Sequence, residues 1–414
     1  MTRRRQFLLS SLAIPALAAA GRATAAQPVR IGALYPLTGN SATAGQEAKA
    51  ALAFGTDLVN TPHPELAALP LAAGSGLPGL GGAKVAIDMV DHRGDPAVAQ
   101  TEALRLITQD RVAALIGAYQ SSCAYTATAV AERYGIPFVV SDSVAANITE
   151  RGYKFTFRVT PIADNFAATY MRFIAEMRKA GQKIDTLAIV NENSDYGTSV
   201  GDAIEAAAKA AKLPVIARVP YSASSADVSA QVLTLKSRQP SLAIFISYTS
   251  DAILYMKTMH SLGYHPPMII GDDSGFNDPS FIKAVGPISQ GAMSRSVWSR
   301  GKQGSLTDRL AVAFKSKTGL EMDDLTGRVL QAFLVLADAI NRAGSTTPAK
   351  VQAALRATDM KPAQLLVGFD GVKFDKTGQN VLGATYLTQI QGAGYVTVWP
   401  EVAAAAKLQW PMSA

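Results

Sequence analysis

Short apolar runs alternate with longer amphipathic stretches along most of the chain. The apolar runs have the length and flanking turn residues of β-strands, and they cover residues 29–34, 84–90, 112–116, 137–141, 186–191, 214–220, 242–247 and 268–270. Helical periodicity marks the stretches between them, at residues 97–109, 124–133, 164–180, 197–211, 228–238 and 251–262. This alternation predicts parallel α/β layers.

The alternation falls into two series, one before and one after about residue 160, and each series has the size of a domain. In the last third of the chain, residues 325–343 and 348–356 predict helices, and residues 384–391 and 395–400 predict a β-hairpin. Residues 61–82 are rich in glycine and proline, which indicates a surface insertion between the first helix and the second strand.

The first 26 residues have the layout of an export leader. Arg3, Arg4 and Arg5 precede an apolar stretch at residues 7–20, and Ala23-Thr24-Ala25 has the small residues of a cleavage site. Arg4-Arg5-Gln6-Phe7-Leu8 also fits a twin-arginine signal, so both the general secretory route and the twin-arginine route stay open. We expect an exported, periplasmic protein, and no later stretch has the length and apolar character to cross a membrane.

Charge and cysteine content narrow the class of protein. Removal of the leader takes away four arginines. The mature chain then has 35 basic and 32 acidic residues and a net charge of about +3. That charge is weak and dispersed, so we expect no nucleic-acid partner. Cys123 is the only cysteine and cannot form a disulfide within the chain, so the fold must be stabilised by its core.

Several sequence motifs match known patterns, but the structure predicted around them does not fit the function of those patterns. The GxGxxG match at residues 74–79 lies in the predicted insertion and not between a strand and a helix, so we expect no dinucleotide cofactor. The GxSxG match around Ser199 should lie inside a helix, away from any recognisable histidine partner, which argues against a serine hydrolase. The four histidines are scattered, and the adjacent Asp272 and Asp273 alone are weak evidence for a cation, so we expect no metal site.

Polar residues gather where the predicted strands end. Ligands of open α/β sheets bind at the carboxyl ends of strands, so these residues are the candidates for a binding site. They are Tyr35, Thr38, Tyr119, Gln120, Ser121, Ser122, Ser141, Asp142 and Ser143 in the first series, and Asn191, Asp195, Tyr196, Tyr248, Thr249, Asp272 and Asp273 in the second.

The two sets have opposite chemical character. Ser121 and Ser122 begin a predicted helix, where hydroxyls and backbone N–H groups favour an anion. Asp272 and Asp273 favour a cation, so a cleft between the two sets suits a zwitterion such as an amino acid. A plainer interpretation is also open for single members, since Ser121 is a good helix cap and the tyrosines are good packing residues.

Seven segments together resemble the leucine/isoleucine/valine-binding proteins of bacterial ABC importers, over residues 29–399. They are IGALYPLTG at 31–39, DHRGDP at 91–96, IGAYQSS at 116–122, ITERGY at 148–153, FRVTP at 157–161, DYG at 195–197 and FDKTG at 374–378. The resemblance implies two doubly wound parallel-sheet lobes of the type I periplasmic binding fold. Their three crossovers lie near residues 162, 296 and 375. It implies an N-terminal lobe of residues 27–162 plus 297–375 and a C-terminal lobe of 163–296 plus 376–414.

The resemblance also implies roles for single residues. Ser121 and the backbone near Ser143 would hold a ligand carboxylate, and Asp273 would receive an ammonium group. Tyr196 and Tyr248 would close over the ligand. With Tyr119, Ser122 and Asp142 from the strand ends, these residues make up the predicted ligand site, which has no catalytic residue.

Two departures leave the ligand open. Val144 stands where amino-acid binders usually have a threonine, Asp142 adds an acid to the same loop, and Ala44 stands where an aromatic residue is usual. We expect a monomeric solute-binding protein that delivers an amino acid of branched-chain type to an ABC permease. The alternatives are an amide, urea-like or aromatic carboxylate ligand, a periplasmic sensor, and a serine hydrolase that uses Ser199.

Overall fold

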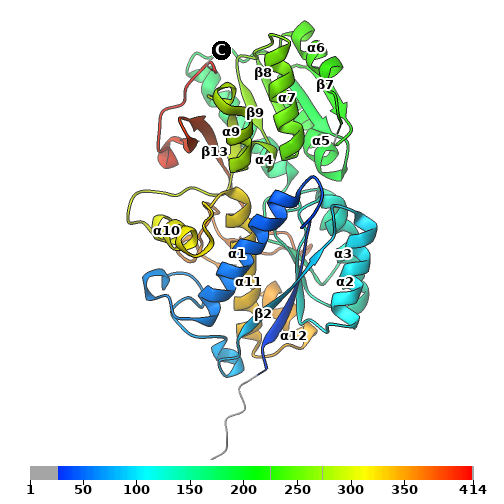
Figure 1. Ribbon diagram of the computed structural model, residues 1–414, viewed down its shortest axis with the longest axis vertical. Helices are drawn as coiled ribbons and strands as arrows, with labels where there is room; N and C mark the ends of the chain where they lie inside the picture. Colours follow the sequence, from blue (N-terminus) through cyan, green and yellow to red (C-terminus); the bar gives the residue numbers. More distant parts are fainter. Residues whose placement is uncertain (1–26, 224, 273, 413–414) are drawn as a thin grey trace, which may run out of the picture.

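Two separate sheets organise the chain, one in each half of the elongated molecule (Figure 1). The computed structural model describes residues 27–223, 225–272 and 274–412, so the predicted leader at 1–26 lies outside the described residues. The first sheet has the strand order β2-β1-β3-β4-β5, and all its pairs are parallel. Its strands are β1 (Val29–Tyr35), β2 (Val85–Asp91), β3 (Ala114–Gly117), β4 (Phe138–Val140) and β5 (Thr156–Arg158).

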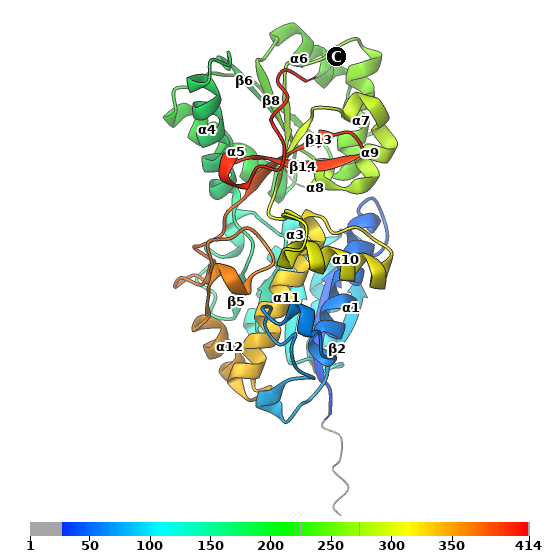
Figure 2. The same ribbon diagram turned by 90° about the vertical axis from the view of Figure 1, so that its left-hand side faces the viewer.

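The second sheet has the order β14-β13-β10-β9-β8-β6-β7. Five strands are parallel: β6 (Leu187–Glu192), β7 (Val215–Tyr221), β8 (Leu242–Ile246), β9 (Ile269–Gly271) and β10 (Met293–Ser296). The predicted hairpin, β13 (Tyr386–Gln391) and β14 (Gly394–Trp399), adds the antiparallel edge. Figure 2 shows this last part of the chain, in red, returning to the second sheet. A third, two-stranded sheet pairs β11 (Asp359–Met360) with β12 (Val372–Lys373).

Helices cover both faces of each sheet. Around the first sheet lie α1 (Ala42–Asn60), α2 (Pro96–Thr108), α3 (Ser121–Tyr134), α10 (Leu306–Thr318), α11 (Asp324–Ala343) and α12 (Pro348–Arg356). Around the second lie α4 (Ala163–Lys179), α5 (Asp195–Ala210), α6 (Ser229–Arg238), α7 (Thr249–Ser261), α8 (Ser274–Asn277) and α9 (Pro279–Val285). The predicted α/β architecture is therefore confirmed.

Alternation along the strands explains the two cores of the first sheet. In β1, Ile31 and Ala33 join the core beneath α1 and α11, whereas Leu34 joins the core beneath α2 and α3. The helix α11 is buried along most of its length. Gly55 of α1 lies so close to Phe333 and Leu330 of α11 that a Cβ there would approach them within 2.6–2.8 Å.

The chain passes from one sheet to the other three times: between β5 and α4, between β10 and α10, and between β12 and β13. These passages agree with the three-crossover fold that the resemblance implies. The residue boundaries predicted for the two lobes stay a prediction. Below, "first lobe" and "second lobe" mean the halves built on the first and second sheets.

The first and third passages run side by side. The backbone N–H of Arg158, at the end of β5, donates to Gly378 O at 2.8 Å, and Asn380 N–H donates to Arg158 O at 2.9 Å. The buried guanidinium of Arg158 adds a bond from Nε to Gln379 Oε1 at 2.6 Å. Two connections between the lobes are thus hydrogen-bonded to each other.

Strands β5 and β10 were not predicted. Both are short and carry a fully buried arginine, Arg158 or Arg295, which contacts a group outside its own strand, Gln379 for Arg158 and Asp272 for Arg295. A sequence window does not contain those partners. None of the helices among the described residues combines the length and hydropathy of a membrane-spanning segment.

Candidate functional site

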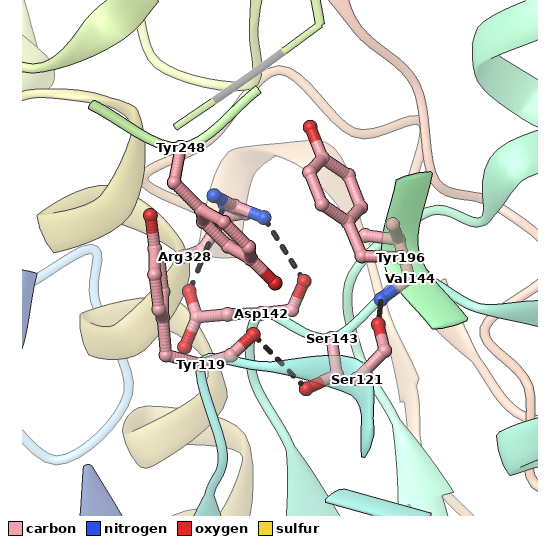
Figure 3. A pocket seen from close by; sticks show the side chains of 8 residues that line it. All are labelled: Tyr119, Ser121, Asp142, Ser143, Val144, Tyr196, Tyr248 and Arg328. Carbon is pink, nitrogen blue, oxygen red and sulfur yellow. Dashed lines mark hydrogen bonds and ion pairs between the residues drawn. The ribbon is translucent and has the colours of Figure 1, made fainter. Parts of the chain in front are cut away.

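One small cavity lies where the carboxyl ends of the two sheets face each other (Figure 3). Its volume is about 10 Å³, and its lining comes from both lobes: Tyr119, Ser121, Asp142, Ser143, Val144, Tyr196, Tyr248 and Arg328. Six of these residues belong to the predicted site. Ligand pockets commonly measure about 300–1,000 Å³, so the two lobes are close together here.

The first lobe reaches the cavity through the loops after β3 and β4. The turn after β3 begins at Gly117, whose φ is +138°. A Cβ at this position would lie 2.5 Å from Leu34 O, so only glycine fits here. Ser121 then begins α3, and its Oγ accepts hydrogen bonds from Val144 N–H and Ala145 N–H, both at 3.3 Å. No described residue accepts the hydroxyl hydrogen of Ser121, which leaves this donor to a ligand.

Ser143 takes a supporting position. Its hydroxyl donates to the carbonyl oxygen of Ala118 at 2.5 Å, so the side chain joins the two cleft loops of the first lobe. The hydroxyl hydrogen is therefore already used within the protein. This leaves the backbone around Ser143 to face a ligand, as the resemblance implies.

Asp142 is buried and paired with Arg328, a residue that the sequence analysis missed. Oδ2 of Asp142 accepts hydrogen bonds from the hydroxyls of Ser141 at 2.5 Å and Tyr35 at 3.4 Å. Arg328 Nη1 donates to the Asp142 carbonyl oxygen at 3.1 Å, and Nε lies 3.7 Å from Oδ1. Asp142 thus positions Arg328 at the cavity wall.

The sequence carries one signal for Arg328. It lies in a helix of mostly apolar residues, four residues after Asp324, and Nε of Arg328 lies 3.0 Å from Asp324 Oδ2. An Asp–Arg pair at this spacing on an apolar helix indicates buried charge that must be compensated. The long amphipathic pattern gives no reason to place that charge in a cleft.

Three tyrosine rings line the cavity and meet across the lobes. The ring centroids of Tyr119 and Tyr248 lie 5.8 Å apart, and those of Tyr196 and Tyr248 lie 5.5 Å apart. Tyr119 belongs to the first lobe and the other two to the second, so ring contacts join the lobes directly. Burial, with Glu192 nearby, raises the pKa of Tyr248 well above its usual range, so its phenol stays protonated.

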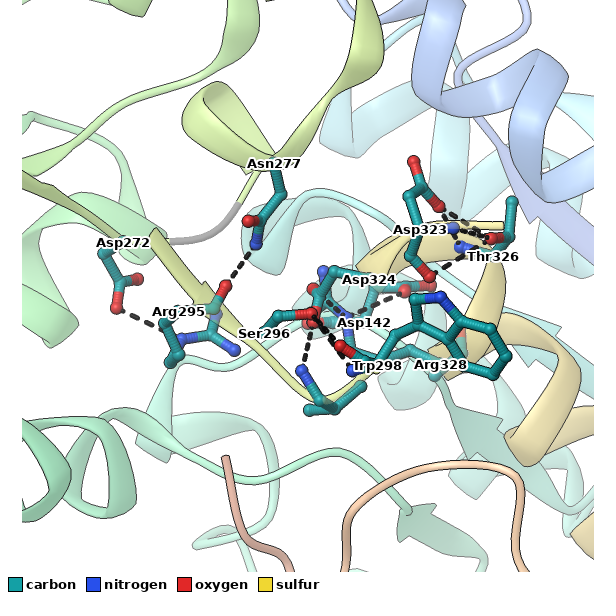
Figure 4. A network of polar contacts seen from close by, with 12 residues as sticks. Asp142, Asp272, Asn277, Arg295, Ser296, Trp298, Asp323, Asp324, Thr326 and Arg328 are labelled. Atoms are coloured by element: carbon teal, nitrogen blue, oxygen red, sulfur yellow. Dashed lines mark hydrogen bonds and ion pairs between the residues drawn. The ribbon is translucent and has the colours of Figure 1, made fainter. Parts of the chain in front are cut away.

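Asp272 supports the site from within the second lobe (Figure 4). It is fully buried, and its Oδ1 lies 3.3 Å from Arg295 Nε. The Tyr196 hydroxyl donates to the backbone oxygen of Asp272 and lies 3.1 Å from its Oδ2. Asp272 therefore fixes the orientation of Tyr196. The predicted ammonium acceptor, Asp273, lies outside the described residues.

Ser122 does not line this cavity. It lines a neighbouring cavity of about 350 Å³ together with Gln120, and Tyr248 forms part of both walls. The structure therefore separates Ser122 from Ser121, although the two residues are adjacent in the chain.

Another cavity, of about 10 Å³, shares Tyr119 with the central one and carries three carboxyl groups. Glu47 comes from α1, Asp323 caps α11, and Asp278 caps α9 of the second lobe. Burial and the two neighbouring acids raise the pKa of Glu47 to about 10, and burial raises the pKa of Asp323 to about 6. Ala44 also lines this cavity, so the missing aromatic residue noted in the sequence leaves space here.

Ser199 lies inside α5, as expected, and its Oγ accepts a hydrogen bond from Ala146 N–H of the first lobe at 3.2 Å. It thus makes a contact between the lobes and does not sit on a strand-to-helix turn. Within the described residues, no three His, Cys, Asp or Glu side chains are placed to hold a metal ion.

Comparisons with known proteins identify relatives of the chain and structures with the same fold. The family model described as "Periplasmic binding protein" matches residues 28–395. The Leu/Ile/Val-binding protein homolog 8 of Brucella suis biovar 1 (strain 1330) is 31% identical over 406 residues, which cover 95% of this chain and 96% of the relative.

The leucine-binding protein LivK of Thermotoga maritima has a similar structure, with a TM-score of 0.76, 21% identity, and coverage of 89% of this chain and 97% of its own. An R. palustris solute-binding protein in complex with benzoate has a TM-score of 0.75 and 18% identity, with 94% of this chain and 98% of its own covered.

Proposed function

The chain belongs to the periplasmic binding protein family, and on that premise we propose that it is the solute-binding component of an ABC importer. It captures an amino acid of branched-chain type between its two lobes and delivers it to a membrane permease. The observation that carries the proposal is the cavity at the facing strand ends, lined by Ser121 and Asp142 of one lobe and Tyr196 and Tyr248 of the other. We further propose that the chain acts in the periplasm as a monomer and as a binding protein, without catalytic activity.

The ligand carboxylate binds at the start of α3 in this proposal. Ser121 offers a hydroxyl donor, and the helix N-terminus offers unpaired backbone N–H groups and a partial positive charge. Arg328 adds a buried positive charge at the cavity wall. Asp273 receives the ammonium group, as the resemblance implies. Charge-assisted hydrogen bonds of this kind contribute about 1.5–3 kcal/mol each, enough for micromolar binding after ordering costs.

Lobe closure follows from contacts that only the closed form makes. The ring contact of Tyr119 with Tyr248 and the bond of Ala146 to Ser199 both join the lobes. A ligand that touches both walls binds the closed form more tightly and therefore shifts the population toward it. The closed form then presents the surface that docks on the permease.

A second candidate ligand is an aromatic carboxylate. The three tyrosine rings that line the cavity favour a flat aromatic group, and Ser121 suits its carboxylate. The same fold holds benzoate in the R. palustris protein. An aromatic acid lacks an ammonium group, so its binding should not depend on Asp273.

A thermal-shift screen of the mature protein tests both candidates. Branched-chain amino acids should raise the Tm by several degrees, because a ligand at 100 times its Kd adds about 2.7 kcal/mol of stability. Ser121→Ala combined with Asp273→Ala should abolish that shift, whereas Thr101→Ala, on the exposed face of α2, should leave it intact. An unchanged shift in the double variant would overturn the site. A shift with benzoates alone, unaffected by Asp273→Ala, would establish the second candidate instead.

A further inference from the structure

A second cavity, here called the outer cavity, lies beside the central one, and residues of both lobes line it. It measures about 350 Å³, and most of its lining residues are polar, including the acid Asp251. Ser41, Arg93 and Gln120 come from the first lobe, and Ser194 and Ser250 come from the second. Tyr248 lines both cavities, and Ser121 of the central cavity stands between Gln120 and Ser122 of the outer one. The outer cavity therefore begins at the end where the proposed ligand has its carboxylate.

Gln120, in the wall of this outer cavity, has a buried amide oxygen without a hydrogen-bond partner among the described residues. Its side chain is more than nine-tenths buried. Buried polar groups are nearly always paired, so the unpaired carbonyl oxygen of a residue that lines a cavity calls for a donor from outside the chain. The other end of the amide lies against the chain, since a Cβ added to Gly94 would lie 3.0 Å from Gln120 Nε2.

Arg93 adds a positive charge to the same wall. It is exposed at the cavity, and within the described chain its guanidinium makes no hydrogen bond or ion pair. Its backbone is held in place, since Arg93 N–H donates to Asp91 Oδ1 at 2.8 Å. An unpaired guanidinium is well suited to a carboxylate, to which it donates two parallel hydrogen bonds.

Together, Gln120 and Arg93 could bind the peptide N–H and the terminal carboxylate that a second residue would add to an amino acid. We propose that the site accepts dipeptides, with the first residue in the central cavity and the second in the outer one. The peptide N–H donates to Gln120 Oε1, and the terminal carboxylate pairs with Arg93. Because the outer wall is polar, the second residue is small or polar. This inference rests on the proposed function and names a longer ligand for the same site.

Calorimetric titration of the full mature chain, freed of bound ligand, tests the inference with leucine, leucinamide and leucyl-glycine. Leucyl-glycine should bind at least about tenfold more tightly than leucinamide, which ends before Arg93; one charge-assisted hydrogen bond accounts for such a factor. Gln120→Leu should weaken leucyl-glycine binding about tenfold and leave leucine binding within about twofold. Arg93→Gln should also act on the dipeptide only. Gln109→Leu, at an exposed glutamine after α2, is the matched control and should change nothing.

Stability gives an independent readout. Because Gln120 Oε1 is buried and unpaired, Gln120→Leu should keep or raise the Tm of the ligand-free protein. A lowered Tm would show that the amide has a structural partner and would overturn the inference. Leucine binding with leucyl-glycine no tighter than leucinamide would overturn the dipeptide and leave the proposed function standing. Failure of all three probes to bind a folded protein would overturn both.

Discussion

The guanidinium of Arg328 is the buried counter-charge of Asp142, with Nε 3.7 Å from Oδ1 and Nη1 donating to the Asp142 carbonyl oxygen at 3.1 Å. Asp142 belongs to the loop after β4, and Arg328 belongs to α11, 186 residues later in the chain. Both side chains are only 1% exposed. The pair fixes the floor of the ligand cavity, and it ties the cavity to the longest helix of the first lobe.

Removing the buried charge of Arg328 should lower the free energy of unfolding strongly. Arg328→Met leaves two buried carboxylates, those of Asp142 and Asp324, without their cation, which should cost about 3–5 kcal/mol of unfolding free energy. Urea denaturation measures this loss. Arg105→Met removes two pairs, with Glu102 and Asp110, at an arginine that is 40% exposed, and should cost under about 1 kcal/mol. Equal losses in the two variants would contradict the buried role of Arg328.

Glu47 should make stability depend on pH. Its pKa is about 10 in the folded protein and near 4.5 when unfolded, so the folded state holds the proton more tightly between these values. Stability is therefore lost as the pH rises through this window. Glu47→Gln removes that loss, and its Tm advantage over the parent protein should grow by a few degrees from pH 5 to pH 9. Glu401→Gln, an exposed control, should follow the parent at every pH.

Tyr248 should contribute strongly to binding because it stands between Tyr119 and Tyr196. Tyr248→Ala removes the ring that joins the lobes, and ligand affinity should fall by about 30-fold or more, as for other central aromatic contacts worth 2 kcal/mol. Tyr248→Phe keeps the ring and should lose less than about tenfold. Calorimetry with a ligand from the thermal-shift screen distinguishes the two. Similar losses in both variants would mean that the phenol, and not the ring, carries the effect.

Ser199→Ala tests the contact between the lobes and the rival hydrolase function in one variant. Without Ser199 Oγ, the Ala146 N–H loses its partner in the closed form, so ligand affinity should fall by about two- to tenfold. Thr198→Ala, one residue earlier on the exposed side of α5, should bind as the parent does. A fluorophosphonate probe should label neither protein. Labelling of the parent that disappears in Ser199→Ala would support a hydrolase.

Much of the site could be predicted from the sequence, because ligands of open α/β sheets bind at the carboxyl ends of the strands. Tyr119, Ser121, Tyr196 and Tyr248 lie far apart in the chain and line one cavity, because each follows a parallel strand whose carboxyl end faces the cleft. Periodicity also predicted α11 to within one residue of its observed bounds.

The misses have a common physical origin. Arg295 looks like a solvent-facing charge in a local window, and the spacing of Arg328 from Asp324 does not place it in a cleft. The positions of both arginines depend on Asp142 and Asp272, which only the folded chain brings near them. Ser122 was predicted to share the site of Ser121. The first turn of α3 directs the two neighbours into different cavities, which strand-end reasoning does not resolve.

The pairing of Arg158 with Gln379 reduces the number of independent joints in this molecule. The first and third passages are hydrogen-bonded to each other between Arg158 and residues 378–380, so we expect them to bend together, while the passage after β10 is separate. Two attachments define one axis, and rotation of the lobes about it meets less resistance than a twist about any other axis. We therefore expect each closure of the lobes to bring Tyr248 back to the same place beside Tyr119.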